Sequence, residues 1–242
     1  MSFAGLGGSA AAEALPKYLG IRFAEDGRAL PDPGNTVVAH LNNAPGAEAI
    51  IRFGEALRTG AIGDCFAHLP VPSYHMTVFN GLLHTDRTLP FWPRTLATDV
   101  GDAEADRWML SQLARHRDVP VPFRMAVRGI TAYEAGGIGL TLEPADEDES
   151  ARIRGLRDRL AELCALAHRP GHDSYRFHLT LAYFLRWPSI EAAMQADREI
   201  AAATEDLLRA CPELVIGPPE GCTFADMTHF EPHFVLGEGE AG

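Results

Sequence analysis

The sequence predicts an α+β fold in which antiparallel strands form the core and helices lie outside it. The chain has 242 residues, of which 46% are hydrophobic and 22% charged, so it is long and apolar enough to bury a sizeable core. Single helical segments alternate with strand-like segments, two of which are joined as a hairpin around Gly136-Gly137. Hairpins mixed with single helices favour an antiparallel α+β architecture over a doubly wound parallel sheet.

The first half of the chain is expected to supply two strands and two helices. The run Thr36–Leu41 is rich in β-branched residues and follows the turn signal Asp32-Pro33-Gly34-Asn35. Residues 1–20 are rich in Gly and Ala and are expected to be loosely ordered. In chain order we predict a strand over 36–41, a helix over 45–60, a strand over 73–79, a long irregular but packed loop over 84–100 and a helix over 102–116.

The second half is expected to supply the hairpin, two longer helices and a β-rich tail. The acidic run Asp146–Glu149 suits the positive N-terminal end of a helix, and Pro170-Gly171 stops that helix. In chain order we predict hairpin strands over 123–133 and 138–142, a helix from 146 to 167, a strand over 175–185, a helix over 189–210, and short strands near 214–216, 224–227 and 234–236.

The charge composition excludes one large class of partner. Lys and Arg number 21 and Asp and Glu number 33, which gives a formal net charge of −12. A general binder of duplex nucleic acid needs an extended basic face, so we expect no duplex partner. A small anionic ligand is still allowed, because a few donors in a cleft can outweigh the average field. The N-terminus lacks a basic start and a membrane-length apolar run, so we expect a cytoplasmic protein without membrane association.

Neither the cysteines nor the closely spaced histidines have the pattern of a metal site. The cysteines are too far apart for a zinc ribbon and are expected to be buried thiols of a reducing compartment. A proline lies between the two histidines of each pair, so neither pair sits on the continuous helix that it would need. We therefore expect no metal and no cofactor. The residues concerned are Cys65, Cys164, Cys211 and Cys222, and the pairs His168/His172 and His229/His233.

Two segments far apart in the chain repeat the pattern His-x-Thr. Ser73–Phe79 contains His75 and Thr77, and Tyr175–Leu181 contains His178 and Thr180. Alternate side chains of a strand point to opposite faces, so each histidine shares a face with its threonine while the hydrophobic residues between them point to a core. The sequence therefore predicts two strands that each present an imidazole together with a hydroxyl.

Two imidazoles that face each other across a cleft suit in-line attack on phosphorus. One neutral imidazole can take a proton from water or a hydroxyl, and the other, protonated, can give one to the leaving oxygen. The unperturbed pKa of histidine, about 6.5, makes both forms accessible, and the threonine hydroxyls can donate to non-bridging oxygens. Such a site needs no metal. The alternative interpretation is a pair of structural histidines bonded to the backbone.

Twin His-x-Thr strands resemble the signature of the 2H phosphoesterase superfamily. The strings Pro33-Gly34-Asn35-Thr36, Ser73–Thr77 and Tyr175–His178 are similar to an uncharacterised branch of it, described as a domain of unknown function. The resemblance spans roughly residues 20–220. It implies that residues 1–242 form one bilobal domain with pseudo-twofold symmetry, in which antiparallel sheets line a central groove, helices lie outside and each lobe supplies one motif strand.

The resemblance also implies the chemistry of the groove. It makes His75 and His178 the acid/base pair, and Thr77 and Thr180 the residues that orient the phosphate. The superfamily's usual substrates carry 2′,3′-cyclic phosphates or are related nucleotide and sugar phosphodiesters. The insertion between residues 84 and 120 departs from the pattern of the superfamily and can reshape or cover the groove.

Five further side chains near the motifs are candidate substrate ligands, each with a structural alternative. Arg176 shares the parity of His178 and could clamp a phosphate with its planar donors, or form a salt bridge at the rim. Aromatic residues of the loop or the groove edge could stack on a base, or pack. The candidates are Arg176, Tyr175, Ser73, Trp92 and Arg87.

The leading hypothesis is a metal-independent phosphodiesterase that hydrolyses a small 2′,3′-cyclic phosphate or nucleotide-derived diester. The alternative is a non-catalytic phosphate or nucleotide-binding protein with the same cleft, and a third is a metal hydrolase that uses scattered His, Asp and Glu. The sequence does not assign which histidine is the base and which the acid. It fits a monomer and a homodimer equally.

Overall fold

The α+β class is confirmed by the computed structural model, which describes residues 3, 14–42, 44–119, 121–133 and 136–238. All pairings between the named strands are antiparallel. The strands are β1 (Gly34–His40), β2 (Phe66–His68), β3 (His75–Leu83), β4 (Phe123–Tyr133), β5 (Gly137–Pro144), β6 (His178–Phe184), β7 (Glu213–Ile216), β8 (Glu220–Phe224) and β9 (Glu231–Val235).

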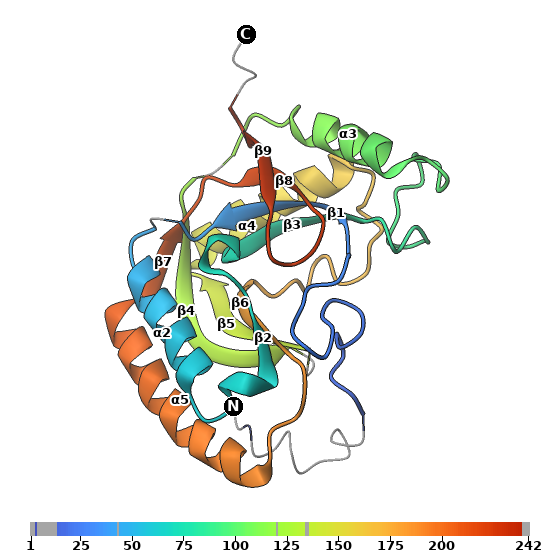
Figure 1. Cartoon of the computed structure of the whole chain (residues 1–242). Coiled ribbons are helices and arrows are strands. Elements are labelled where there is room, and N and C mark those ends of the chain that lie inside the picture. Colours follow the sequence, from blue (N-terminus) through green and yellow to red (C-terminus); the bar gives the residue numbers. More distant parts are fainter. Residues whose placement is uncertain (1–2, 4–13, 43, 120, 134–135, 239–242) are drawn as a thin grey trace.

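Eight of these strands follow one another in a single curled sheet (Figure 1). Their order is β7-β4-β5-β6-β3-β1-β8-β9, and β2 pairs with β6 beside that path. The two motif strands, β3 and β6, are therefore neighbours within one sheet, rather than parts of the separate sheets that we expected. Their direct contact is short, because it consists of the pair Met76 and Leu179.

Four α-helices of the described residues pack in two pairs on this sheet. They are α2 (Ala47–Thr59), α3 (Asp102–Leu113), α4 (Glu147–Leu163) and α5 (Ile190–Ala210). α2 and α5 lie side by side along one flank of the molecule (Figure 1), with α5 against β4. α4 packs against β3 and β5, and α3 packs against β1, β3 and β8. α4 and α5 begin with side-chain caps, as Asp146 accepts from the Glu149 N–H and Ser189 from the Ala192 N–H.

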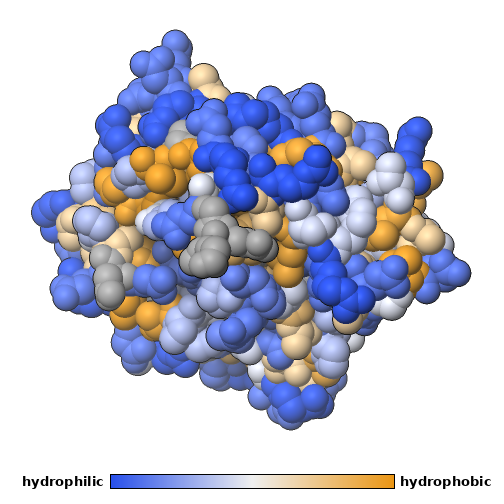
Figure 2. All heavy atoms as spheres, turned by 90° about the horizontal axis from the view of Figure 1, so that it is seen from above, coloured by the Kyte–Doolittle hydropathy of each residue, from blue (hydrophilic) through white to orange (hydrophobic). Residues whose placement is uncertain are grey.

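No helix of the described segments has both the length and the apolar character needed to cross a membrane. The face shown in Figure 2 is covered largely by hydrophilic side chains, with hydrophobic ones in scattered patches.

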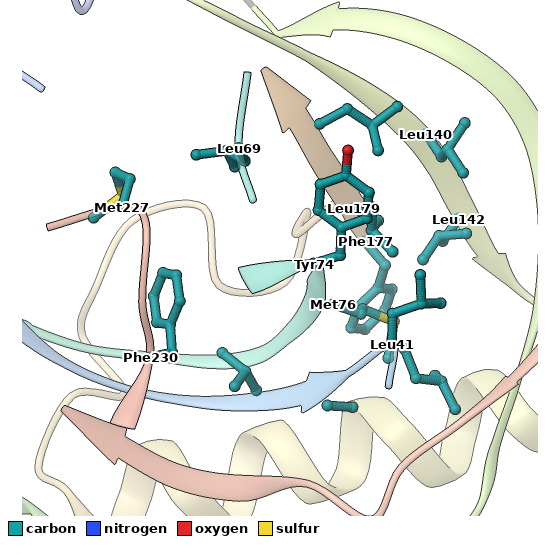
Figure 3. Packing of buried hydrophobic residues seen from close by; sticks show 14 of the residues in the cluster. Leu41, Leu69, Tyr74, Met76, Leu140, Leu142, Phe177, Leu179, Met227 and Phe230 are labelled. Atoms are coloured by element: carbon teal, nitrogen blue, oxygen red, sulfur yellow. The ribbon is translucent and has the colours of Figure 1, made fainter. Parts of the chain in front are cut away.

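Alternation within β3 and β6 buries one face of each motif strand. Met76, Val78, Leu179 and Leu181 are at most 1% exposed, whereas the histidine and threonine positions between them are only partly buried. Figure 3 shows Met76 and Leu179 in the same apolar cluster as Leu140. A slip of one residue would bring these apolar side chains to the solvent face, at a cost of about 1.5–3 kcal/mol for each large one. Burial thus fixes which face carries the histidines.

The motif strands begin later than the sequence predicts. The strand expected over 73–79 starts at His75, because Val71–Ser73 form a 3₁₀ turn, and it runs on to Leu83. The strand expected over 175–185 starts at His178 and ends at Phe184. Each motif histidine is therefore the first residue of its strand, so the residues before it lie outside the period-two pattern.

Other departures concern element ends. The helix expected to reach residue 167 ends at Leu163, and the strand expected near 224–227 is β8, which ends at Phe224. Nothing in the sequence predicts the three-residue strand β2. Of the N-terminal segment expected to be loosely ordered, residues 1–2 and 4–13 lie outside the described residues. Residues 14–20 are described, and the ring of Tyr18 lies 5.5 Å from that of Tyr183 in β6.

Close approach of β5 and β6 predicts a marked effect of one added methyl group. A Cβ at Gly139 would lie 2.0 Å from the backbone oxygen of Leu179. We expect Gly139→Ala to lower the free energy of unfolding by about 1–3 kcal/mol, because the two strands must move apart. In Gly155→Ala in α4, the added Cβ would meet only the flexible end of Arg159, at 3.3 Å. This substitution should raise the free energy of unfolding by about 0.5–1 kcal/mol. Urea unfolding measures both variants, and a Gly139→Ala protein as stable as the wild type would contradict the close packing.

Candidate functional site

All four motif side chains line one pocket of about 430 Å³. His75 and Thr77 reach it from β3, and His178 and Thr180 reach it from β6. The sequence therefore predicts correctly that the two distant motifs come together and that each histidine shares a face with its threonine. A pocket of this size is in the range of small-molecule sites.

The register of β3 and β6 sets how the four side chains face each other. Met76 lies opposite Leu179 in an antiparallel pair, so His75 comes opposite Thr180 and Thr77 opposite His178. The two histidines are then diagonal neighbours, which are typically separated by about 7–8 Å. By this register each imidazole comes opposite a hydroxyl across the seam.

Both imidazoles are oriented by the same backbone contact. Nδ1 of His75 lies 2.7 Å from the carbonyl oxygen of Ser73, and Nδ1 of His178 lies 2.9 Å from that of Arg176. A carbonyl oxygen can only accept, so Nδ1 is the donating nitrogen in each ring. In the neutral form the proton is on Nδ1 and the free lone pair is on Nε2. In this tautomer Nε2 can accept a proton from a group in the pocket. In each motif the accepting carbonyl belongs to the residue two positions before the histidine.

A β-bulge follows the threonine in both motifs. Thr77 and Phe79 pair with the consecutive residues Val38 and Val37, so Val78 is the extra residue of β3. Thr180 and Ala182 likewise pair with Gly139 and Ile138, so Leu181 is the extra residue of β6. A bulge reverses the alternation beyond it. The third residue after each threonine, Asn80 in β3 and Tyr183 in β6, consequently also lines the pocket.

The pocket walls lower the pKa of both histidines. Enclosure of His75 lowers its pKa to about 4, and His40 and His178 act in the same direction, while the bond to Ser73 opposes the shift. The His75 ring lies 4.2 Å from the ring of Phe230 and 6.2 Å from that of His40. Enclosure also lowers the pKa of His178, against the bond to the Arg176 carbonyl. Near neutral pH without a ligand, both imidazoles are therefore largely uncharged.

Tyr175 is the one candidate ligand outside the His-x-Thr pairs that lines the pocket. Burial raises the pKa of its hydroxyl, although Arg157 and the side chain of Thr77 act against that rise. Behind its ring lies the guanidinium of Arg157, 3.9 Å from the ring centre and only 3% exposed as a residue. Arg157 also donates to the backbone oxygen of Val78, the bulge residue, at 2.6 Å. Tyr175 thus couples a buried cation to a motif hydroxyl.

The other four candidate ligands are not among the residues that line the pocket, which corrects their expected placement. Ser73 and Arg176 precede the strands, so parity does not aim their side chains at the groove; their carbonyls orient the histidines instead. Trp92 is 1% exposed and donates to the Leu96 carbonyl at 3.0 Å, and Arg87 stacks on it at 4.8 Å. Both residues hold the 84–100 loop together, and Phe91 of that loop reaches the pocket.

Sequence reasoning missed two arginines and an apolar wall. Arg22 lies in the N-terminal segment, and Arg169 follows α4. Arg169 donates to the backbone oxygens of Asn80, Gly81 and Phe91 at 2.7–2.9 Å. Burial lowers its pKa to about 10. The apolar wall comes from the last residue of β8, Phe224, and from the segment between β8 and β9, which supplies Met227 and Phe230.

One cluster of the described residues could hold a metal ion, and it is not in the pocket lining. Asp158, His172 and Asp173 offer ligand atoms within 4.8 Å of one another, and Nε2 of His172 lies 2.8 Å from Oδ1 of Asp158. Both carboxylates are exposed, so an ordinary surface ion pair accounts for the arrangement. The four cysteines are free thiols and buried.

Comparison with known proteins places these features in a family context. The family model described as 2H-phosphodiest: Domain of unknown function (DUF1868) matches residues 22–136, which include the first motif but not the second. The structure is similar to that of a conserved protein of unknown function, ATU0111, from Agrobacterium tumefaciens. The two are 31% identical with a TM-score of 0.86, and the match covers 96% of this chain and 97% of that one. None of the curated proteins matches the chain.

Enclosure of a neutral His75 predicts that the fold loses stability in acid. The pKa of His75 is about 4 in the folded protein and about 6.5 when unfolded, so the unfolded chain binds more protons between these values. The stability present above pH 6.5 is therefore lost progressively as the pH falls toward 4, by about 1–2 kcal/mol at pH 5. In His75→Gln, the difference in unfolding free energy between pH 7.5 and 5.0 should shrink by that amount. Chemical unfolding of both proteins at the two pH values measures this. If the free energy of unfolding changes equally with pH in wild type and His75→Gln, the lowered pKa of His75 is contradicted.

Proposed function

The chain belongs to the 2H-phosphodiest family, described as a domain of unknown function, and from this membership we propose that it hydrolyses a small phosphodiester without a metal ion. The observation that carries the proposal is the matched placement of His75 and His178. Each begins a strand, each is held through Nδ1 by the carbonyl two residues earlier, and each faces a threonine in one pocket. Structural histidines have no need of such a matched arrangement on both sides of a cavity.

The proposed reaction is an in-line displacement by water. Nε2 of one neutral imidazole takes a proton from water, whose oxygen attacks phosphorus. The bond from phosphorus to the leaving oxygen breaks, and the second imidazole, protonated, gives its proton to that oxygen. Thr77 and Thr180 donate to the non-bridging oxygens as negative charge shifts onto them. The products are a phosphate monoester and a hydroxyl group, and exchange of one proton with solvent restores the two imidazoles.

The surroundings of the histidines favour His75 as the base and His178 as the acid. His75 is enclosed between Phe230 and His40, and its pKa is lowered to about 4, so it is neutral over most of the pH range. The pKa of His178 is lowered to a smaller extent, by enclosure against the bond to the Arg176 carbonyl. An anionic phosphodiester between the rings raises the pKa of each, because an opposite charge favours the protonated form. Substrate binding thus helps to protonate the acid.

We also propose that the two halves of the sheet correspond to the two lobes implied by the 2H resemblance. Four strands, β7-β4-β5-β6, lie on one side of the β3–β6 contact, and four, β3-β1-β8-β9, on the other. The repeated backbone contact and the repeated bulge support an internal pseudo-twofold relation. Within this arrangement, a 2′,3′-cyclic phosphate or another small nucleotide-derived diester is the substrate class that fits the pocket best.

One observation favours a second candidate, a phosphate or nucleotide-binding protein without catalysis. The lowered pKa values leave few molecules with a protonated acid near neutral pH. Calorimetric titration with a 2′,3′-cyclic nucleotide separates the two candidates. Saturable binding with no product after prolonged incubation at acid and neutral pH would favour the binding protein.

Loss of either histidine should abolish most of the activity. We expect His75→Ala and His178→Ala each to reduce kcat about 10²–10⁴-fold on a panel of 2′,3′-cyclic nucleotides with EDTA present, because each removes one proton transfer. The double variant should be little worse than either single one, since both residues serve one step. His233→Ala, an exposed histidine outside the pocket lining, is the matched control and should keep the wild-type rate. Full activity in either single variant would contradict the assigned pair.

The pH dependence of kcat/KM should have an acid optimum. The base must be neutral and the acid protonated, so kcat/KM of the free enzyme rises as His75 loses its proton near pH 4 and falls as His178 loses its own. Because the pKa of His178 is lowered from its usual value, that fall occurs below about pH 6.5. Initial rates at low substrate concentration between pH 4 and 9 measure the profile. A kcat/KM that rises from pH 6 to 9 would contradict the roles given to the two residues.

A further inference from the structure

The N-terminal segment places one guanidinium in the pocket, beyond the motif residues of β6. Arg22 lines the pocket, and its Nη1 lies 3.3 Å from the hydroxyl of Tyr183. Tyr183 is the residue that the bulge after Thr180 turns toward the pocket. Thr180 and Tyr183 are three positions apart on β6, with the bulge residue Leu181 between them. The guanidinium therefore lies in the part of the pocket that is formed by Tyr183.

The position of this guanidinium is fixed before any ligand arrives. Nε of Arg22 donates to Oδ2 of Asp32 at 2.9 Å, and its Cζ lies 4.4 Å from the centre of the Tyr18 ring. Asp32 is itself held, because its Oδ1 accepts from Thr85 at 3.1 Å. Burial alone would lower the pKa of Arg22, but Tyr183, Tyr18 and Asp32 together raise it, so the side chain is charged throughout the useful pH range.

Donors of this fixed guanidinium are still available to a ligand. Among the described residues, Nε bonds to Asp32 and Nη1 to Tyr183, whereas Nη2 has no partner. A guanidinium offers five N–H donors in a planar fork, which matches the oxygens of a phosphate. Arg169 differs in which atoms are engaged, since both of its Nη atoms bond to backbone oxygens and, among the described residues, its buried Nε is the atom without a partner.

The rest of the pocket is poorly suited to a second anion. Phe224, Met227 and Phe230 make one wall apolar, and Asp86 is the carboxylate that lines the pocket. The chain as a whole carries a formal charge of −12, so attraction of an anion depends on local cations. Of the two arginines that line the pocket, Arg22 is the one with an Nη atom that has no partner among the described residues.

We propose that Arg22 binds a second anionic group of the substrate, a phosphate monoester, in the same pocket as the phosphorus held between His75 and His178. The proposal rests on the proposed function for the location of the reacting phosphate. It narrows the substrate from any small diester to one that carries a further phosphate. It also gives the N-terminal segment the task of selecting that substrate.

The test compares two ligands that differ by one phosphate and are not phosphodiesters. Adenosine 2′-monophosphate and adenosine 2′,5′-bisphosphate are titrated calorimetrically into wild type, Arg22→Gln and Arg28→Gln at fixed salt. Arg28 belongs to the same segment but is exposed and outside the pocket lining, so it controls for loss of one charge. We expect wild type and Arg28→Gln to bind the bisphosphate about tenfold more tightly, as one charge-assisted contact implies. In Arg22→Gln the ratio should fall to about one.

Thermal unfolding shows whether Arg22→Gln is folded. If the variant is unfolded, its titration is replaced by chemical modification of the wild-type arginines with phenylglyoxal, mapped by mass spectrometry. The bisphosphate should then protect Arg22 from modification more than the monophosphate does. Equal affinities of wild type for the two ligands, no binding of the bisphosphate, or a preference that survives in Arg22→Gln would each overturn the proposal. Both ligands are monoesters, so an absence of phosphodiesterase turnover would count only against the proposed function.

Discussion

The contact between β3 and β6 is the constraint on which the site depends. Burial of Met76 and Leu179 against the shared core leaves each strand a single orientation, and their pairing sets the register between the strands. The face opposite to this apolar pair then carries two imidazoles and two hydroxyls. Two short segments about a hundred residues apart in the chain form one pocket because their hydrophobic residues, rather than their functional ones, pack together.

The parts of the site that follow from local pattern could be predicted from the sequence, and the parts that arrive from distant loops could not. Period-two alternation placed His75, Thr77, His178 and Thr180 on one face, and hydrophobic spacing located the four helices. Ser73 and Arg176 were misplaced because strand geometry was extended past the point where each strand begins.

The missed residues share a physical cause. Arg22, Arg169 and Phe230 lie in segments without a regular period, and their contact with the pocket is a result of tertiary packing alone. The bulges at Val78 and Leu181 were equally invisible, because no glycine or proline marks them, and they decide that Asn80 and Tyr183 face the pocket. An aromatic residue of the 84–100 loop does line the pocket, but it is Phe91 and not Trp92, which packs within the loop.

The three hydrogen bonds of Arg169 have a mechanical consequence for the long insertion. A single guanidinium joins the distal end of β3 to the backbone at Phe91, and the chain that carries it comes from beyond α4. Swinging this insertion away would remove the Phe91 carbonyl from the guanidinium, which would keep its bonds to Asn80 and Gly81. The loss of one hydrogen bond to a charged group costs about 1.5–3 kcal/mol. The insertion is therefore anchored at Phe91, and the free energy needed to move it away from the pocket includes the loss of this bond.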